Sequence, residues 1–222
     1  MLLQQNAVYA YGEMRMVDEQ SQGNEGEISK REQILNGAME EFLTHGYAGT
    51  SMDRVAKTAG VSKATVYSHF GDKQGLFTAL VERLAEKKFE LLFDPKLLSA
   101  SPEVGLRDLA TKGLLNAMAD QEHLTFVRLI IGESGRFPEL AQTFARSLAF
   151  PAIYRLTQYF IAHPELKIQD PEAAARIFMG SMVYFVLLQE ILGGKAVKPT
   201  DFQGLVNTLV DLLTQYQEKT IN

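Results

Sequence analysis

The chain has 222 residues, which is longer than one typical domain of about 100–150 residues, and 46% of them are hydrophobic and 22% charged, as in a globular protein with a real core. It contains no cysteine, which excludes a disulfide scaffold, a thiol nucleophile and a cysteine zinc site. The net charge of −5 argues against nucleic-acid binding by the surface as a whole. Residues 54–73, however, contain four basic residues and one acid, and a phosphate backbone responds to the local field of the docking face.

Residues 1–28 are polar, with five acids and one base, and have no periodic apolar face, so we expect a flexible tail. No basic start followed by an apolar run is visible, so no secretory signal is expected. The longest uncharged apolar run, residues 177–189, is shorter than a bilayer span requires. We therefore expect a soluble, cytoplasmic protein.

Helical periodicity continues through the rest of the chain, and no strand pattern exceeds a few residues. Capping boxes are expected at residues 50–53 and 200–203, further caps at Ser62 and Asp72, and a kink at Pro151. The expected helices cover residues 30–45, 51–59, 63–70, 73–92, 102–119, 123–134, 137–163, 171–192 and 202–216.

Two of these helices, 51–59 and 63–70, are short and are joined by Gly60-Val61-Ser62, a spacing typical of a helix-turn-helix. In such a unit the second helix lies in the major groove of DNA. Small apolar residues hold the two helices together and leave polar side chains on the outer surface, all of which can donate hydrogen bonds: Lys63, Thr65, Tyr67, Ser68 and His69. Tyr67 could instead pack partly inward beside Val66.

The segments 46–47, 50–56, 59–70, 73 and 76–77 resemble the DNA-binding domain of the TetR family of bacterial transcriptional regulators. The similarity covers about residues 30–77, and the segments 137–140 and 170–175 resemble the subgroup with AefR-like C-terminal domains. This resemblance implies an all-α fold. A helix-turn-helix DNA-binding domain over 29–76 would be followed by a larger helical domain over 77–222 for ligand binding and dimerisation.

The resemblance also implies the site residues. Lys63, Thr65, Tyr67 and His69 occupy positions where family members meet DNA, Thr50 and Ser51 positions that hold phosphate, and Lys73 a position at the DNA backbone. Plain helix capping is the alternative role for Thr50, Ser51 and Ser62. The expected interface is Thr50, Ser51, Ser62, Lys63, Ala64, Thr65, Tyr67, Ser68, His69 and Lys73. Since residues 63–70 contain no Arg, Asn or Gln, base reading would rest on Lys63, on thymine-methyl contacts and on DNA shape.

The second domain is expected to supply a dimer surface and a ligand cavity. A helix as apolar all round as 171–192 needs burial on every side, which favours a homodimer through the last two helices over a monomeric bundle. A cavity is expected among the middle helices, although the same apolar residues could be simple core. Its expected lining is Leu115, Met118, Phe126, Leu129, Ile130, Glu133, Phe144, Tyr154, Met179 and Met182, with Arg128 and Tyr184 as further polar anchors.

These features favour a dimeric, ligand-responsive repressor that binds a palindromic double-stranded DNA operator and is released by a small, largely apolar effector. The alternative is a DNA-binding activator or architectural protein regulated by a protein partner. An enzyme is not expected, because no nucleophile elbow, phosphate loop or catalytic triad is visible. Neither a cofactor nor a metal is expected, and none of the four histidines forms a His-x-x-x-His pair.

Overall fold

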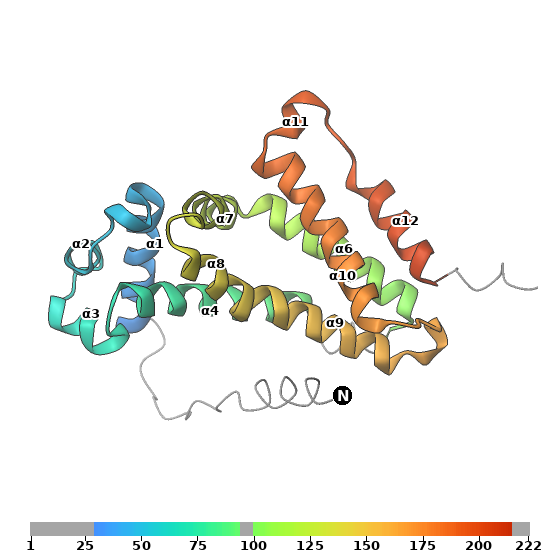
Figure 1. The fold of residues 1–222 in the computed structure, drawn as a ribbon, viewed down its shortest axis with the longest axis horizontal. Helices are drawn as coiled ribbons and strands as arrows, with labels where there is room; N and C mark the ends of the chain where they lie inside the picture. Colours follow the sequence, from blue (N-terminus) through green and yellow to red (C-terminus); the bar gives the residue numbers. More distant parts are fainter. Residues whose placement is uncertain (1–28, 94–99, 215–222) are drawn as a thin grey trace, which may run out of the picture.

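The computed structural model describes residues 29–93 and 100–214, and within these ranges every regular element is helical (Figure 1). The expected tail, residues 1–28, and the expected end of the last helix, residues 215–216, lie outside the described residues. The all-α expectation is confirmed. The longer elements are α1 (Lys30–Gly49), α2 (Met52–Thr58), α3 (Lys63–Phe70), α4 (Lys73–Leu92), α6 (Pro102–Ala119), α7 (Gln121–Glu133), α8 (Pro138–Phe144), α9 (Phe150–Ala162), α10 (Pro171–Val186) and α12 (Phe202–Thr214).

Side-chain caps fix where the first four helices begin. Ser29, Ser51, Ser62 and Asp72 each accept a hydrogen bond from the backbone N–H three residues later, which satisfies a donor that the helix itself leaves free. The expected capping box at residues 50–53 is one residue out of register, because Ser51 and not Thr50 caps α2. The box at 200–203 is displaced in the same way, since α12 begins at Phe202 and Asp201 accepts from the Gln203 N–H.

Two apolar cores lie along the molecule, and α4 reaches from one toward the other (Figure 1). The first core unites α1, α2, α3 and the first half of α4, and it also includes Phe126 and Ile130 of α7 and Leu140 of α8. The second core is built by α6, α9, α10 and α12. Because α7 and α8 contribute to the first core, the helices that follow residue 76 share this core with the helix-turn-helix segment that precedes it.

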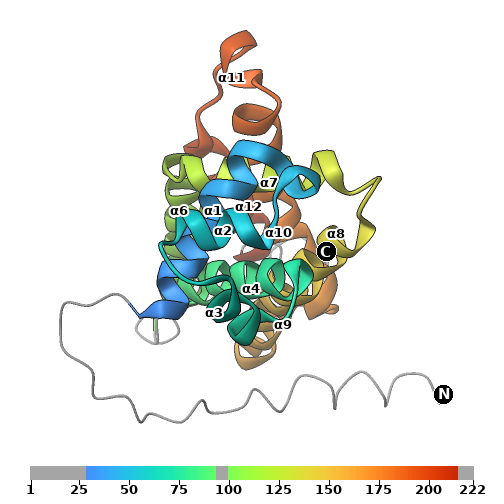
Figure 2. The same ribbon diagram turned by 90° about the vertical axis from the view of Figure 1, so that its left-hand side faces the viewer.

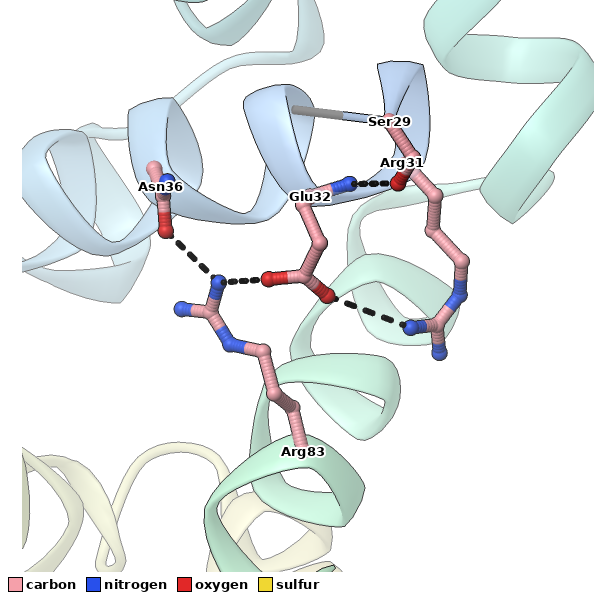
Figure 3. A network of polar contacts seen from close by, with 5 residues as sticks. All are labelled: Ser29, Arg31, Glu32, Asn36 and Arg83. Carbon is pink, nitrogen blue, oxygen red and sulfur yellow. Dashed lines mark hydrogen bonds and ion pairs between the residues drawn. The ribbon is translucent and has the colours of Figure 1, made fainter. Parts of the chain in front are cut away.

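A buried arginine ties the start of α1 to α4 (Figure 3). The Arg83 guanidinium donates to the Glu32 carboxylate over 3.1 Å and to the side-chain amide oxygen of Asn36 over 2.7 Å. Arg31 lies 3.7 Å from the same Glu32 carboxylate. Since a buried charge needs such partners, this network fixes the position of α1 on α4.

The segment 137–163 is interrupted just before Pro151, where a kink was expected. A π-helical turn, η1 (Ala145–Ala149), lies between α8 and α9. Proline has no N–H to donate to the carbonyl four residues earlier, and a wider turn is one way in which a helix adjusts to that loss.

A second π-helical turn, η3 (Leu187–Ile191), extends α10 into a helix of 21 residues, Pro171–Ile191. By length and composition alone this helix could cross a membrane, although the uncharged run of residues 177–189 covers only part of it. The helix begins six residues before the uncharged run at residue 177. Core helices share these properties, and its inner face, with Ala175 and Phe178, packs into the second core.

Candidate nucleic-acid interface

The helix-turn-helix is formed by α2 and α3 at one end of the molecule, and Figure 2 faces this end. The turn needs Gly60, whose φ of 65° lies in the left-handed region that favours glycine. Val55 and Val66 are fully buried between the helices. Gly37 lets α1 approach the end of α2 closely, because a Cβ there would lie 2.9 Å from the Ala59 nitrogen.

The outer face of α3 carries the side chains that the sequence places there. Lys63, Ala64, Ser68 and His69 are exposed, and Thr65 is half-buried. Tyr67 is 43% exposed, so it points outward and the inward alternative is not what the structure adopts. Ser51 and Ser62 are also exposed while they cap α2 and α3, so capping leaves both side chains accessible from solvent.

Lys63 is the cation at the start of α3, and it has an acidic neighbour on α2. Its ammonium lies 2.7 Å from the Asp53 carboxylate and 5.7 Å from the centre of the Tyr67 ring. The hydrogen bond and the charge of Asp53 raise the pKa of Lys63. Both partners are exposed, and such pairs exchange readily with other charged groups.

Thr50 does not present its hydroxyl to DNA. It is 2% exposed, and its hydroxyl lies 2.9 Å from the Glu41 carbonyl oxygen and 2.8 Å from that of Gly46. Gly46 kinks α1 with a φ of 70°, which frees these carbonyls for the side chain. Thr50 therefore caps the end of α1 and not the start of α2. Because its side chain is buried, it cannot make the expected phosphate contact in this conformation.

Lys73 is likewise used within the fold. Its ammonium donates to the carbonyl oxygens of Tyr47 (2.8 Å) and Thr50 (3.0 Å) and lies 4.5 Å from the centre of the Tyr47 ring. Burial lowers the pKa of Lys73. This side chain joins the start of α4 to the end of α1, so its ammonium already has partners within the fold, and the contact of this position with the DNA backbone stays a prediction.

The ten residues expected to line a ligand cavity do not meet at one place. Phe126 and Ile130 lie in the first core with Leu129 and Phe144 packed against it, whereas Met118, Met179 and Met182 belong to the second. Leu115 and Tyr154 are exposed. The Glu133 carboxylate reaches Gly46 at the kink of α1 and lies 3.9 Å from Arg136. The spacing was misleading because one face of α7 packs on the first core and not on the second.

The two polar anchors expected beside that cavity are not directed into it. Arg128 donates to the backbone oxygens of Glu190 and Ile191, at the end of η3. Tyr184 is exposed on the outer face of α10. In the described ranges, no group of three or more His, Asp and Glu side chains is placed to hold a metal ion.

Comparison with protein families settles what kind of chain this is. The model of the bacterial regulatory proteins of the tetR family matches residues 34–80, and that of the AefR-like transcriptional repressor C-terminal domain matches residues 105–217. The chain belongs to the TetR family. The family and the relatives found are transcriptional regulators and not enzymes, so this TetR-family chain is a DNA-binding regulator with an N-terminal helix-turn-helix domain and a helical C-terminal domain.

Individual TetR-family members show how far the similarity extends. The repressor AcnR of Corynebacterium glutamicum is 36% identical over 70 residues, so the match spans 32% of this chain and 37% of AcnR. The solved structure of the flavonoid-responsive regulator FrrA is 32% identical over 84% of this chain and 94% of FrrA, with a TM-score of 0.64. A TetR-family regulator from Mesorhizobium loti is 27% identical over 84% of this chain and 93% of its own, with a TM-score of 0.68.

Proposed function

We propose that the protein is a homodimeric transcriptional repressor that binds a palindromic operator through α3 and is released by a small, largely apolar effector. The observation that carries the proposal is the exposed outer face of α3. It presents Lys63, Tyr67, Ser68 and His69 to solvent beside the exposed cap Ser62. Such side chains fit phosphate oxygens and base edges, and the family supplies the DNA partner.

Phosphate contacts are proposed to supply most of the operator affinity. The interface has no Arg, Asn or Gln in α3, the residues best suited to bidentate base reading, so base recognition would rest on Lys63 and on DNA shape. The expected consequence is a steep fall of affinity with salt, with a log–log slope of about −0.9 for each phosphate contacted. A nearly flat slope would contradict this part of the proposal.

A homodimer through α10 and α12 is proposed because α10 has an apolar face that this protomer leaves uncovered. Ile177, Val183 and Tyr184 are exposed on α10, with Leu188 and Leu192 continuing from η3. On α12, Leu212 is exposed beside the small residues Gly204 and Thr208. Pairing two such surfaces by two-fold symmetry would bury them and set two recognition helices about 34–36 Å apart on DNA.

The effector is proposed to be a small aromatic compound of the flavonoid kind. The support is the name of FrrA, a flavonoid-responsive regulator that matches this chain over most of both lengths. The FadR of Bacillus subtilis, solved with stearoyl-CoA, is only 19% identical, so its similarity supports the fold and not the identity of the ligand. Effector binding would release the operator by favouring a dimer in which α4, which begins at Lys73 beside the DNA-binding domain, is tilted.

The experiment begins with selection of duplexes from a random pool by the purified full chain. The bound complex is then challenged with a flavone, and release is followed by fluorescence anisotropy. We expect enrichment of an inverted repeat and weaker operator binding when flavone is present. If no sequence is enriched, the repressor proposal is overturned. If an operator is enriched but flavone does not release it, the proposed effector is contradicted.

One alternative has its own support. FasR of Mycolicibacterium smegmatis, an activator, is 37% identical over 79 residues, so an activator is the second candidate. Transcription in vitro from a promoter that carries the selected operator separates the two. A repressor lowers the yield of transcript, whereas an activator raises it. Either regulator would act in the cytoplasm, where the genome lies.

A further inference from the structure

A hollow of about 380 Å³ lies where the end of the long helix, α11 (Gly194–Val197) and the start of α12 meet α6. In Figure 1, α11 and the loop to α12 extend beyond the end of α10. The hollow is lined by Met118, Phe185, Gln189, Glu190, Lys195 and Asp201, among others. Its volume falls within the range of about 300–1,000 Å³ typical of small-molecule sites. Of the ten residues expected to bind ligand, Met118 alone lines it.

Gln189 is the unusual residue of this hollow. It lies in the π-helical turn η3 and is 6% exposed. Its side-chain oxygen accepts the Thr200 N–H over 3.2 Å, whereas its amide nitrogen has no hydrogen-bond partner in the described part of the chain. This nitrogen is not among the enclosed polar atoms that lack a partner, so it is open to an acceptor from outside the chain, and π-helical turns occur often at functional sites. An acceptor brought by a ligand would satisfy this donor.

The other lining side chains define the chemistry of that ligand. The Phe185 ring and the Met118 thioether form an apolar surface, and both groups pack well on aromatic rings. At the edge, the Lys195 ammonium lies 3.3 Å from the Glu190 carboxylate and is therefore neutralised. Asp201 adds another carboxylate, which disfavours an anionic ligand and can accept a hydrogen bond from a hydroxyl.

The wall of the hollow is connected to the DNA-binding half by α7. Arg128 donates to the carbonyl oxygens of Glu190, over 2.6 Å, and Ile191. On the same helix, Ile130 packs in the first core, and Glu133 reaches Gly46 at the kink of α1. A change in the π-helical turn would therefore act on α7, which contacts the DNA-binding domain directly.

We infer that this hollow binds a neutral aromatic ketone with a phenolic hydroxyl. The ring lies on Phe185 and Met118, the carbonyl accepts from the Gln189 amide, and the hydroxyl donates to a carboxylate at the edge. The inference deepens the proposed function, on which it rests, because it gives the effector a site and a chemical class. It places that site at the ends of α6 and α10, away from the other nine residues expected to line a cavity.

The test uses the full chain with 7-hydroxyflavone as the probe, titrated by its fluorescence. Gln189→Glu keeps the oxygen that accepts from Thr200 but removes the amide donor, and Gln203→Glu makes the same change at an exposed position outside the hollow. We expect Gln189→Glu to weaken binding at least tenfold and Gln203→Glu to leave it unchanged. Equal binding by Gln189→Glu and the wild-type chain would overturn the inference.

A second measurement locates the probe without any variant, in case Gln189→Glu does not fold. The methionine methyl groups report by NMR, and Met118 lines the hollow while Met182 lies in the second core. We expect the Met118 signal to shift more than the Met182 signal when the probe is added. An equal or larger shift of Met182, or no binding at all by a chain that still binds its operator, would overturn the site while the DNA-binding proposal stands.

Discussion

Lys63 and Asp53 form an ion pair of 2.7 Å across the two helices of the helix-turn-helix. The pair joins the first turn of α2 to the first residue of α3, on the face that we propose meets DNA. Phosphate must compete with the Asp53 carboxylate for the Lys63 ammonium. We therefore expect Asp53 to act against DNA binding, both by holding this cation and by its own charge.

Asp53→Asn is expected to strengthen operator binding by about two- to fivefold at low salt, because it removes a competing anion from the interface. Fluorescence anisotropy at several salt concentrations measures the effect. Glu103→Gln is the matched control, since it removes the acid of another exposed ion pair, with Arg107 on α6. Unchanged or weaker binding by Asp53→Asn would show that the acid contributes to the interface in another way.

Lys63 and Lys73 are expected to differ in what their loss changes. Lys73→Met leaves two backbone carbonyls without their donor and should lower the free energy of unfolding by about 1–2 kcal/mol. Lys63→Met should leave unfolding unchanged and reduce the salt slope of operator binding by about one unit. Chemical denaturation and salt titration of both variants provide the test, and a stable Lys73→Met with a reduced salt slope would place Lys73 among the DNA contacts.

Stability is expected to fall as the pH drops from about 6.5 to about 4, and His123 is one cause. Burial, helped by the charge of Lys88, lowers the pKa of His123 to about 4. Between its unfolded and folded pKa values the unfolded chain binds a proton that the folded chain does not, so folding weakens as the pH falls. The His123 contribution is on the order of 1–3 kcal/mol.

His123→Gln is expected to flatten this dependence, and denaturation curves at pH 7, 6, 5 and 4.5 measure it. His163→Gln serves as the comparison, because the His163 ring donates to the Tyr159 carbonyl oxygen and lies at the end of α9. The slope and not the absolute stability is the readout. If both variants keep the slope of the unaltered protein, His123 is not its source.

The proposed dimer is tested by a charge on the exposed face of α10. Tyr184 is 63% exposed there, and Tyr154 is 57% exposed on α9, so the same substitution can be made at both sites. Tyr184→Asp is expected to give monomers in sedimentation experiments and to weaken operator binding at least tenfold, because two half-sites would no longer be bound together. Tyr154→Asp should remain dimeric, and the reverse result would place the interface on α9.

Most of the fold could be predicted from the sequence because helix starts are encoded locally. Ser62, Asp72 and the prolines at the starts of α6 and α10 each mark a beginning by a short-range hydrogen bond or by a restricted φ. The cap of α2 was assigned one residue early because Thr50 and Ser51 are both good caps. Which one serves is decided by the kink at Gly46, a feature of the preceding helix.

The site could be predicted only in part, because exposure depends on neighbours that are distant in the sequence. The outward residues of α3 follow from its own periodicity, and they are exposed as expected except for Thr65, which is half-buried. Lys73 donates hydrogen bonds to the backbone carbonyls of Tyr47 and Thr50, which lie 26 and 23 residues earlier. No pattern in the sequence near Lys73 indicates these partners. The hollow at Gln189 was missed for the same reason, since it depends on a π-helical turn and on the return of the chain at Thr200.

The most direct test of the account is operator binding by a chain altered only on the outer face of α3. A selected duplex is titrated by fluorescence anisotropy with the unaltered protein, with Tyr67→Ala/His69→Ala and with Tyr154→Ala, and melting temperatures are measured alongside. The account predicts that the double variant loses at least about tenfold in specific affinity while its melting temperature is unchanged. Undiminished affinity of a fully folded Tyr67→Ala/His69→Ala protein would contradict it.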